Sequence, residues 1–224
     1  MADERQPREV MIGEMSRSYA VALLAGDEVA AEAAVRKAMD AGLGTAEIDD
    51  GIIAPALWLV GDLWERGEIS IADEHLATEI STRVVTLQRE AVRVAGGRRD
   101  HRVMLATPAG EHHVVALRML DALLREGGYD VLMLGPDVPP NVLADIASRY
   151  EPDAICLSST MAGGSDALFA AIDEIRRRLP QTGFLVGGRG VAARMRPLPG
   201  VDVAAHVSGA VDAVDALVQR AHMN

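Results

Sequence analysis

The sequence is poor in several residue types, and each shortage excludes a class of protein. Cys156 is its single cysteine, which excludes an intrachain disulfide framework and is typical of a reducing cytoplasm. Lysine and arginine number 22 against 33 aspartates and glutamates, a net charge of −11. Because a nucleic-acid-binding face needs clustered positive charge, we expect no direct contact with nucleic acid. The single cysteine leads us to expect a cytoplasmic protein.

Long hydrophobic runs are also missing. No stretch approaches the roughly 20 apolar residues that a membrane-spanning helix needs, so we expect no membrane association. Residues 1–9 are charged, and no apolar segment of a signal peptide follows them. Aromatic residues make up only 3% of the chain, so alanine, valine and leucine must build the core. That composition suits closely packed helices and a buried sheet.

The first part of the chain has helical hydrophobic spacing throughout, up to about residue 95. Gly26, Gly42 and Gly67 separate the helical patterns, because glycine commonly ends helices. Pro55 falls inside the third pattern and predicts a kink or a break there. These signals predict a four-helix bundle that forms a cap domain over residues 1–97.

The fourth predicted helix begins with an unusual pair of polar residues. Ser70, with Asp73 three residues later, resembles a capping box at its start. At about 100° per residue, Glu74 and His75 fall well off the apolar stripe of this helix. We therefore expect both side chains to point away from the bundle core, toward something outside it. The stripe is expected at Leu76, Ile80, Val84, Leu87, Ala91 and Val94.

The pattern changes after a linker at residues 96–100. Short apolar segments then alternate with helical ones, which indicates a parallel, doubly wound sheet. We predict an α/β fold with an all-α cap, in which a five-stranded flavodoxin-like (Rossmann-like) domain covers residues 98–224. The expected strands are 103–106, 129–134, 154–157, 184–186 and 201–205, and the expected helices are 114–126, 140–149, 165–178 and 209–221.

Polar residues and glycines follow several of these strands. In such sheets, ligands bind beyond the carboxyl ends of the strands. The loop after the first strand contains Glu111, His112 and His113, and an imidazole whose other nitrogen donates to a carboxylate is a common metal ligand. A polar loop that only caps its helix is the alternative. Two more loops at the same edge carry Ser158, Ser159 and Thr160, and Gly187 and Gly188.

Taken together, these loops resemble the cobalamin-binding family. Glu111-x-His113-x-x-Ala116, with Ser158-x-Thr160 and Gly187-Gly188, is similar to that family's signature, although Ala116 stands where the family has glycine. The resemblance implies that His113 is the lower axial ligand of cobalt and that Glu111 supports it. It also implies that the nucleotide tail of the cofactor lies along His112, Ala116, Ser158, Ser159, Thr160, Gly187 and Gly188.

The predicted helical domain, residues 1–97, resembles one subgroup of this family in particular. Trp64-x9-Glu74-His75 is similar to a motif of the CarH-type light-sensing regulators, which bind adenosylcobalamin. The resemblance implies that all three residues lie over the upper face of the cofactor, and that His75 can ligate cobalt after light breaks the cobalt–carbon bond. Because the first predicted helix begins within about ten residues of Met1, we do not expect the DNA-binding domain of those regulators here. We therefore expect a homo-oligomer, or a protein partner such as a transcription regulator, to carry the signal.

Two alternatives to a light sensor stay open. A corrinoid methyl carrier, the non-catalytic subunit of a methyltransferase system, would share the lower-ligand motif and the helical cap. A binding module for another tetrapyrrole, haem or a bilin, would use the same histidines, although Cys156 lies in a predicted buried strand where a covalent bilin link is not expected. No nucleophilic triad, phosphate-binding loop or paired acid–base carboxylates are evident, so we expect no independent enzyme activity.

Overall fold

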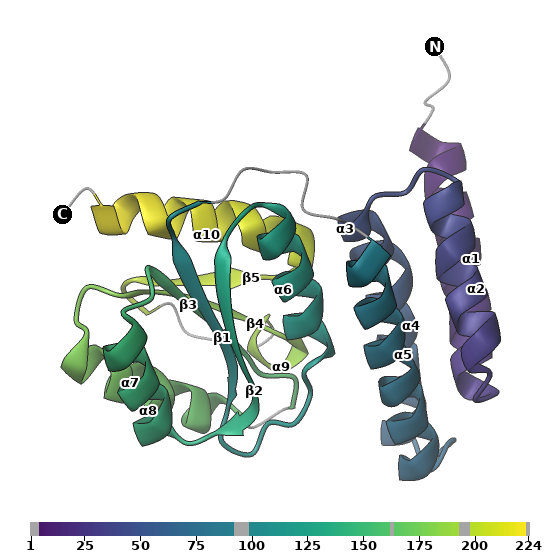
Figure 1. The fold of residues 1–224 in the computed structure, drawn as a ribbon. Coiled ribbons are helices and arrows are strands. Elements are labelled where there is room, and N and C mark those ends of the chain that lie inside the picture. Colours follow the sequence, from purple (N-terminus) through teal and green to yellow (C-terminus); the bar gives the residue numbers. More distant parts are fainter. Residues whose placement is uncertain (1–4, 92–98, 162–163, 193–197, 223–224) are drawn as a thin grey trace. The chain divides into compact units, whose positions relative to one another are not determined.

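The chain forms two compact units in the computed structural model, which describes residues 5–91, 99–161, 164–192 and 198–222. Unit 1 is Met1–Val92 and unit 2 is Arg93–Asn224. The domain boundary expected between residues 97 and 98 falls outside the described residues. The predicted fold class, an α/β domain with an all-α cap, is confirmed (Figure 1).

Unit 1 is built from helices alone among its described residues. The largest side chains of its core are fully buried, and Tyr19, Leu23 and Ile52 are among them. The third helical pattern of the sequence consists of three consecutive elements, with a π-helical turn in the middle. The elements are α1 (Arg5–Leu24), α2 (Glu28–Asp40), α3 (Thr45–Ile48), the π-helical turn η1 (Asp49–Ile53), α4 (Ala54–Glu65) and α5 (Ile71–Ala91).

The starts of these helices follow the local sequence signals. The Asp27 carboxylate caps α2 by accepting the N–H of Ala30 at 2.9 Å. The predicted capping box of α5 is present: Ser70 Oγ accepts the N–H of Asp73 at 3.2 Å, and the Asp73 carboxylate accepts the N–H of Ser70 at 2.8 Å. The chain does not break at Pro55: the π-helical turn runs directly into α4, and Ile53 and Ala54 keep helical φ and ψ angles. The irregularity in this pattern is the π-helical turn itself, and Pro55 lies in the first turn of α4.

The buried face of α5 differs from the predicted stripe. Leu76 and Leu87 are exposed, so these two positions of the expected stripe were wrong, whereas Ile80 and Val84 are buried as expected. Ala91 and Val94 lie outside the residues whose side chains are described. Small and polar side chains take the place of Leu76 and Leu87 in the core, where Tyr19 Oη donates to Ser81 Oγ at 3.0 Å. A small residue lets a neighbouring helix approach closely, and a hydrogen bond offsets the cost of burying a hydroxyl. The face comprises Ala77, Ile80, Ser81, Val84, Val85 and Gln88.

Unit 2 contains an all-parallel sheet with the strand order β2-β1-β3-β4-β5. This is the flavodoxin-like order, in which β1 and β3 are neighbours and the chain reverses its direction of winding between them. The strands are β1 (Arg102–Pro108), β2 (Asp130–Val138), β3 (Ala154–Ser158), β4 (Gly183–Gly187) and β5 (Val201–Ala204). The helices are α6 (Val115–Glu126), α7 (Pro140–Tyr150), α8 (Ser165–Arg178), α9 (Arg189–Ala192) and α10 (Val207–His222).

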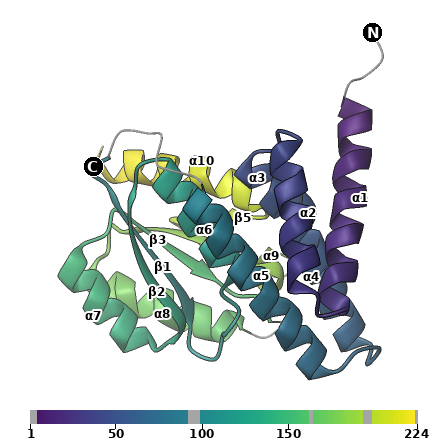
Figure 2. The same cartoon turned by 45° about the vertical axis from the view of Figure 1, so that its right-hand side comes forward.

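Helices cover both faces of this sheet (Figure 2). Because successive strand residues point to opposite faces, Val103 and Leu105 pack with α6 and α10. Met104 and Ala106 pack with α7 and α8 on the other face. The sheet is thus buried on both sides, and the loops at the carboxyl ends of its strands are left to form a site.

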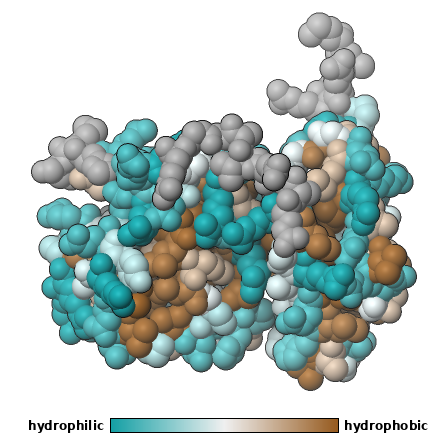
Figure 3. All heavy atoms as spheres, viewed as in Figure 1, coloured by the Kyte–Doolittle hydropathy of each residue, from teal (hydrophilic) through white to brown (hydrophobic). Residues whose placement is uncertain are grey.

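The surface carries both hydrophilic and hydrophobic side chains. On the side drawn in Figure 3, hydrophilic residues alternate with patches of hydrophobic ones. Trp58 and Leu59 on α4 are among the large hydrophobic residues that are exposed. Single exposed apolar residues are normal on folded proteins. Within the described ranges, none of the helices combines the length and the apolar character that crossing a bilayer requires.

Candidate functional site

The loop between β1 and α6 holds His113 in a defined orientation. His113 Nδ1 donates to Glu111 Oε1 at 2.6 Å, and the backbone N–H of His113 donates to the same oxygen at 3.0 Å. The Glu111 carboxylate is buried, while the imidazole is half-exposed. With its proton on Nδ1, a neutral imidazole carries its lone pair on Nε2, the nitrogen that can then bind a metal.

The Glu111 carboxylate also reaches a second loop. Its Oε2 accepts the backbone N–H of Thr160 at 2.6 Å and that of Met161 at 3.1 Å. Burial raises the pKa of Glu111, but the hydrogen bonds from His113 and from the backbone amides of Met161 and Thr160 outweigh it and lower the pKa to about 2. Glu111 therefore stays ionised at neutral pH and connects the histidine loop to the loop after β3.

The last residue of β3 and the loop that follows it present two buried hydroxyl groups. Ser158 and Ser159 are almost completely buried, and neither Oγ has a hydrogen-bond partner among the residues that the structure describes. A buried hydroxyl without a partner is costly, so it commonly marks a place where a ligand or water completes the hydrogen bonding. Thr160 beside them is half-buried. This edge of the sheet therefore fits a ligand with polar groups.

The two glycines after β4 close the same edge. The backbone N–H of Ser159 donates to the carbonyl of Gly187 at 2.9 Å. Gly188 has φ +99°, and a Cβ placed on it would lie 2.3 Å from the carbonyl oxygen of Ser159. Only glycine allows the two loops to approach this closely. The sequence prediction that Gly187 and Gly188 lie with the serines is thus met by the geometry of unit 2.

Replacing Gly188 with alanine is expected to displace the loop after β3, which carries Ser159 and Thr160. The added methyl group would overlap backbone atoms of Ser159, and φ +99° is strained for any other residue. We expect the free energy of unfolding of unit 2 to fall by about 3 to 5 kcal/mol. Gly209→Ala in α10 is the matched control, because its Cβ would meet nothing within 4 Å. Urea unfolding followed by circular dichroism measures both, and equal stability of the two variants would contradict the close approach.

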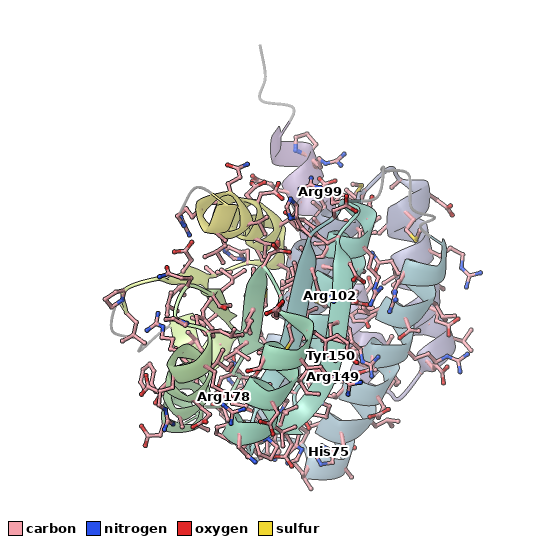
Figure 4. All side chains as sticks on the ribbon, turned by 60° about the vertical axis from the view of Figure 1, so that its left-hand side comes forward. His75, Arg99, Arg102, Arg149, Tyr150 and Arg178 are labelled. Carbon is pink, nitrogen blue, oxygen red and sulfur yellow. The ribbon has the colours of Figure 1, made fainter. Side chains whose placement is uncertain are left out.

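A second glutamate–histidine pair lies in unit 1, on the first turn of α5. His75 Nδ1 donates to Glu74 Oε2 at 2.7 Å, and Thr78 Oγ1 donates to Glu74 Oε1 at 3.0 Å. The His75 side chain is 71% exposed, whereas Glu74 is largely buried. Figure 4 labels His75 near the start of α5. The expectation that both point away from the core is therefore met by His75 alone. Trp64 is half-buried in the last turn of α4.

The remaining predicted residues lie beside His113, and two further residues were not predicted. His112 is exposed in the loop, and Ala116 is half-buried in the first turn of α6. Sequence patterns did not single out Thr107 and Asp137, although both hydrogen-bond to the carbonyl of Glu111. No local signal identifies them, because their contact depends on how β1 and β2 pair.

Known proteins resemble both units of the chain. Residues 101–217 match the family described as B12 binding domain, and residues 15–87 match a second family of the same description. The chain is 32% identical over 163 residues to the HTH-type transcriptional repressor CarH of Myxococcus xanthus, covering 70% of this chain and 52% of that protein. It is 24% identical over 179 residues to monomethylamine corrinoid protein 1 of Methanosarcina acetivorans, covering 76% and 81%.

A solved structure shares the fold of the chain. The monomethylamine corrinoid protein of Methanosarcina barkeri superposes with a TM-score of 0.76 at 15% sequence identity, covering 91% of this chain and 98% of that one. At this identity the likeness shows the fold alone. The chain spans about half the length of the two Myxococcus xanthus repressors that it matches, CarH and CarA.

Proposed function

The chain belongs to the B12-binding domain family, and on that premise we propose that it is a light sensor that binds adenosylcobalamin. The observation that carries the light-sensing part is the set of Trp64, Glu74 and His75 in unit 1, which resembles the motif of CarH-type regulators. The 32% identity to a CarH repressor supports the same assignment. Family membership also favours a corrinoid over haem or a bilin as the tetrapyrrole.

In this proposal, unit 2 holds the lower face and the tail of the cofactor. His113 would ligate cobalt through Nε2, because Nδ1 donates to Glu111. Ionised Glu111 keeps that tautomer and orients the ring. The buried hydroxyls of Ser158 and Ser159 would form hydrogen bonds with the polar nucleotide tail. Thr160, Gly187, Gly188, His112 and Ala116 are assigned to the same tail site.

Unit 1 is assigned to the upper face. The bound cofactor would supply a cobalt–carbon bond that visible light breaks. Trp64 would shield that face from water, and His75 would take the upper ligand position after photolysis. His75 is suited to this role because Glu74 holds its proton on Nδ1, as Glu111 does for His113. A change of ligand at His75 would then bias a protein interface, either in a homo-oligomer or with a transcription regulator.

A corrinoid methyl carrier is the second candidate. The match to monomethylamine corrinoid protein 1 favours it, because the chain covers 81% of that protein but only 52% of the CarH repressor. A carrier would have no activity of its own and would present its upper face to a methyltransferase. In that case Trp64 and His75 would have no role in a response to light.

The experiment that separates the two candidates compares dark and green-lit protein loaded with adenosylcobalamin. We expect the absorption spectrum to change irreversibly on illumination, together with a change in elution volume on a sizing column. His75→Ala is expected to lose the change in size, while Glu79→Ala, exposed one turn further along α5, keeps it. If the illuminated and the dark protein have the same size and the same partner binding, the proposed light-sensing function is wrong. Methylation of the bound cofactor by a partner enzyme would then support the carrier.

A further inference from the structure

The end of β2 departs from regular pairing beside the histidine loop. Leu105 pairs with Met133, but Ala106 pairs with Gly135 and Pro108 with Val138, so β2 uses more residues than β1 over the same length. Such bulges bend a strand and commonly re-aim a residue next to a functional site. They lie where β2 passes the loop that carries Glu111 and His113.

Asp137 is the residue that the irregular pairing re-aims. It has φ +55°, which is uncommon for any residue with a side chain, although aspartate tolerates it better than most. Its backbone N–H donates to Thr107 Oγ1 and to the Glu111 carbonyl oxygen, both at 3.0 Å. Its carboxylate accepts the N–H of Gly110 at 2.7 Å. A strained conformation of this kind persists only where the surrounding contacts hold it.

These contacts close into one network, which we call the Asp137 lock: Thr107, Gly110, Glu111 and Asp137. The hydroxyl of Thr107 is buried and donates to the Glu111 carbonyl oxygen as well as accepting from Asp137. The lock thus fixes the backbone of Glu111. The carboxylate of the same residue binds His113 and the amides of Thr160 and Met161.

We propose that Asp137 and Thr107 are positioning residues that set His113 and the loop after β3 in place before the corrinoid binds. The inference rests on the proposed corrinoid function and assigns these two residues to it. Glu111 can hold the imidazole and two backbone amides at once only if its main chain stays fixed. An imidazole that is already oriented loses less entropy on ligation, which tightens binding.

Asp137→Gly tests this directly, because glycine relieves the backbone strain and removes only the acceptor of the Gly110 N–H. We expect the Kd for adenosylcobalamin in the dark to rise about 10- to 100-fold, the range for residues that support a metal ligand. The fraction of imidazole-ligated cofactor in the absorption spectrum should fall with it. In Asp137→Asn, the Kd and the fraction of imidazole-ligated cofactor should both stay near the wild-type values, because the amide oxygen can accept the same hydrogen bond from the Gly110 N–H. Glu151→Gly is the matched control, because Glu151 has φ +44° and ends α7, away from the lock.

Hydrogen exchange of the cofactor-free protein gives a readout that does not depend on cobalamin. We expect Asp137→Gly to speed exchange at the amides of Thr160 and Met161, which Asp137 does not contact, and Glu151→Gly to leave them unchanged. Unchanged exchange at both amides, or an unchanged Kd, in Asp137→Gly would overturn the positioning role. If wild-type protein bound no corrinoid, the proposed function would fail, and exchange alone would decide whether the lock holds the loop.

Discussion

Replacing His113 with alanine is expected to weaken binding of adenosylcobalamin by more than about 100-fold and to remove the imidazole-ligated absorption spectrum. The expectation follows from the geometry of the pair: Glu111 holds the proton of His113 on Nδ1, so Nε2 is the ligating nitrogen. The loss should exceed that of any residue that only supports the ligand. Because Ser158, Ser159 and the glycine loop remain, some binding through the nucleotide tail should survive.

Two further measurements show whether the weaker binding is caused by loss of the His113 imidazole itself. Free imidazole added to His113→Ala should partly restore the ligated spectrum, because it can occupy the space of the missing ring. His101→Ala is the control, since His101 precedes β1 at the other end of that strand. Unchanged affinity and spectrum in His113→Ala would mean that the cofactor keeps its own base or binds elsewhere. Spectral titration in the dark measures both quantities.

Asp49→Asn is expected to stabilise unit 1 by roughly 4 kcal/mol above pH 7 and to have little effect near pH 4. Asp49 is fully buried on the π-helical turn η1, and neither carboxylate oxygen has a partner among the described residues. Burial, with a smaller contribution from Asp50, raises the pKa of Asp49 from 3.8 to about 7. Folding is therefore favoured while Asp49 is protonated, and this advantage is lost as the pH rises from 3.8 through 7. Asparagine cannot ionise, so it escapes that loss.

Tryptophan fluorescence can follow this effect in the whole protein. Both tryptophans of the chain, Trp58 and Trp64, lie on α4, so their emission reports on unit 1. Urea unfolding between pH 4 and 8 should show the stabilities of wild type and Asp49→Asn separating with rising pH. Glu79→Gln, a change at an exposed site on α5, should follow the wild type. A constant difference across this range would show that Asp49 does not titrate inside the fold.

The elements that local chemistry dictates could be predicted from the sequence. The capping box of Ser70 and Asp73 needs only a few neighbouring residues. The parallel sheet followed from the alternation of short apolar segments with helices. Because parallel strands end at the same edge of a sheet, it could also be predicted that the loop with Glu111 and His113 lies next to the loop after β3.

Features that depend on tertiary pairing could not be predicted. Hydrophobicity alone placed Leu76 and Leu87 in the core of unit 1, but close helix packing selects Ala77 and Ser81 instead. The contact of Asp137 with the histidine loop arises from irregular pairing of β1 and β2, which leaves no periodic pattern in the sequence. The roles assigned to Trp64, His75 and the tail residues come from resemblance, so they stay predictions.

The most direct test of the central claim, that His113 ligates the cobalt of a corrinoid, is an electron paramagnetic resonance spectrum of the protein loaded with cob(II)alamin. One axial ¹⁴N ligand splits each cobalt line into a triplet, and a ¹⁵N ligand splits it into a doublet. We predict that protein labelled with ¹⁵N-histidine gives doublets and that labelled His113→Ala does not. Triplets in the labelled wild type would show that the cofactor's own base is the ligand, and doublets in His113→Ala would assign the ligand to another histidine.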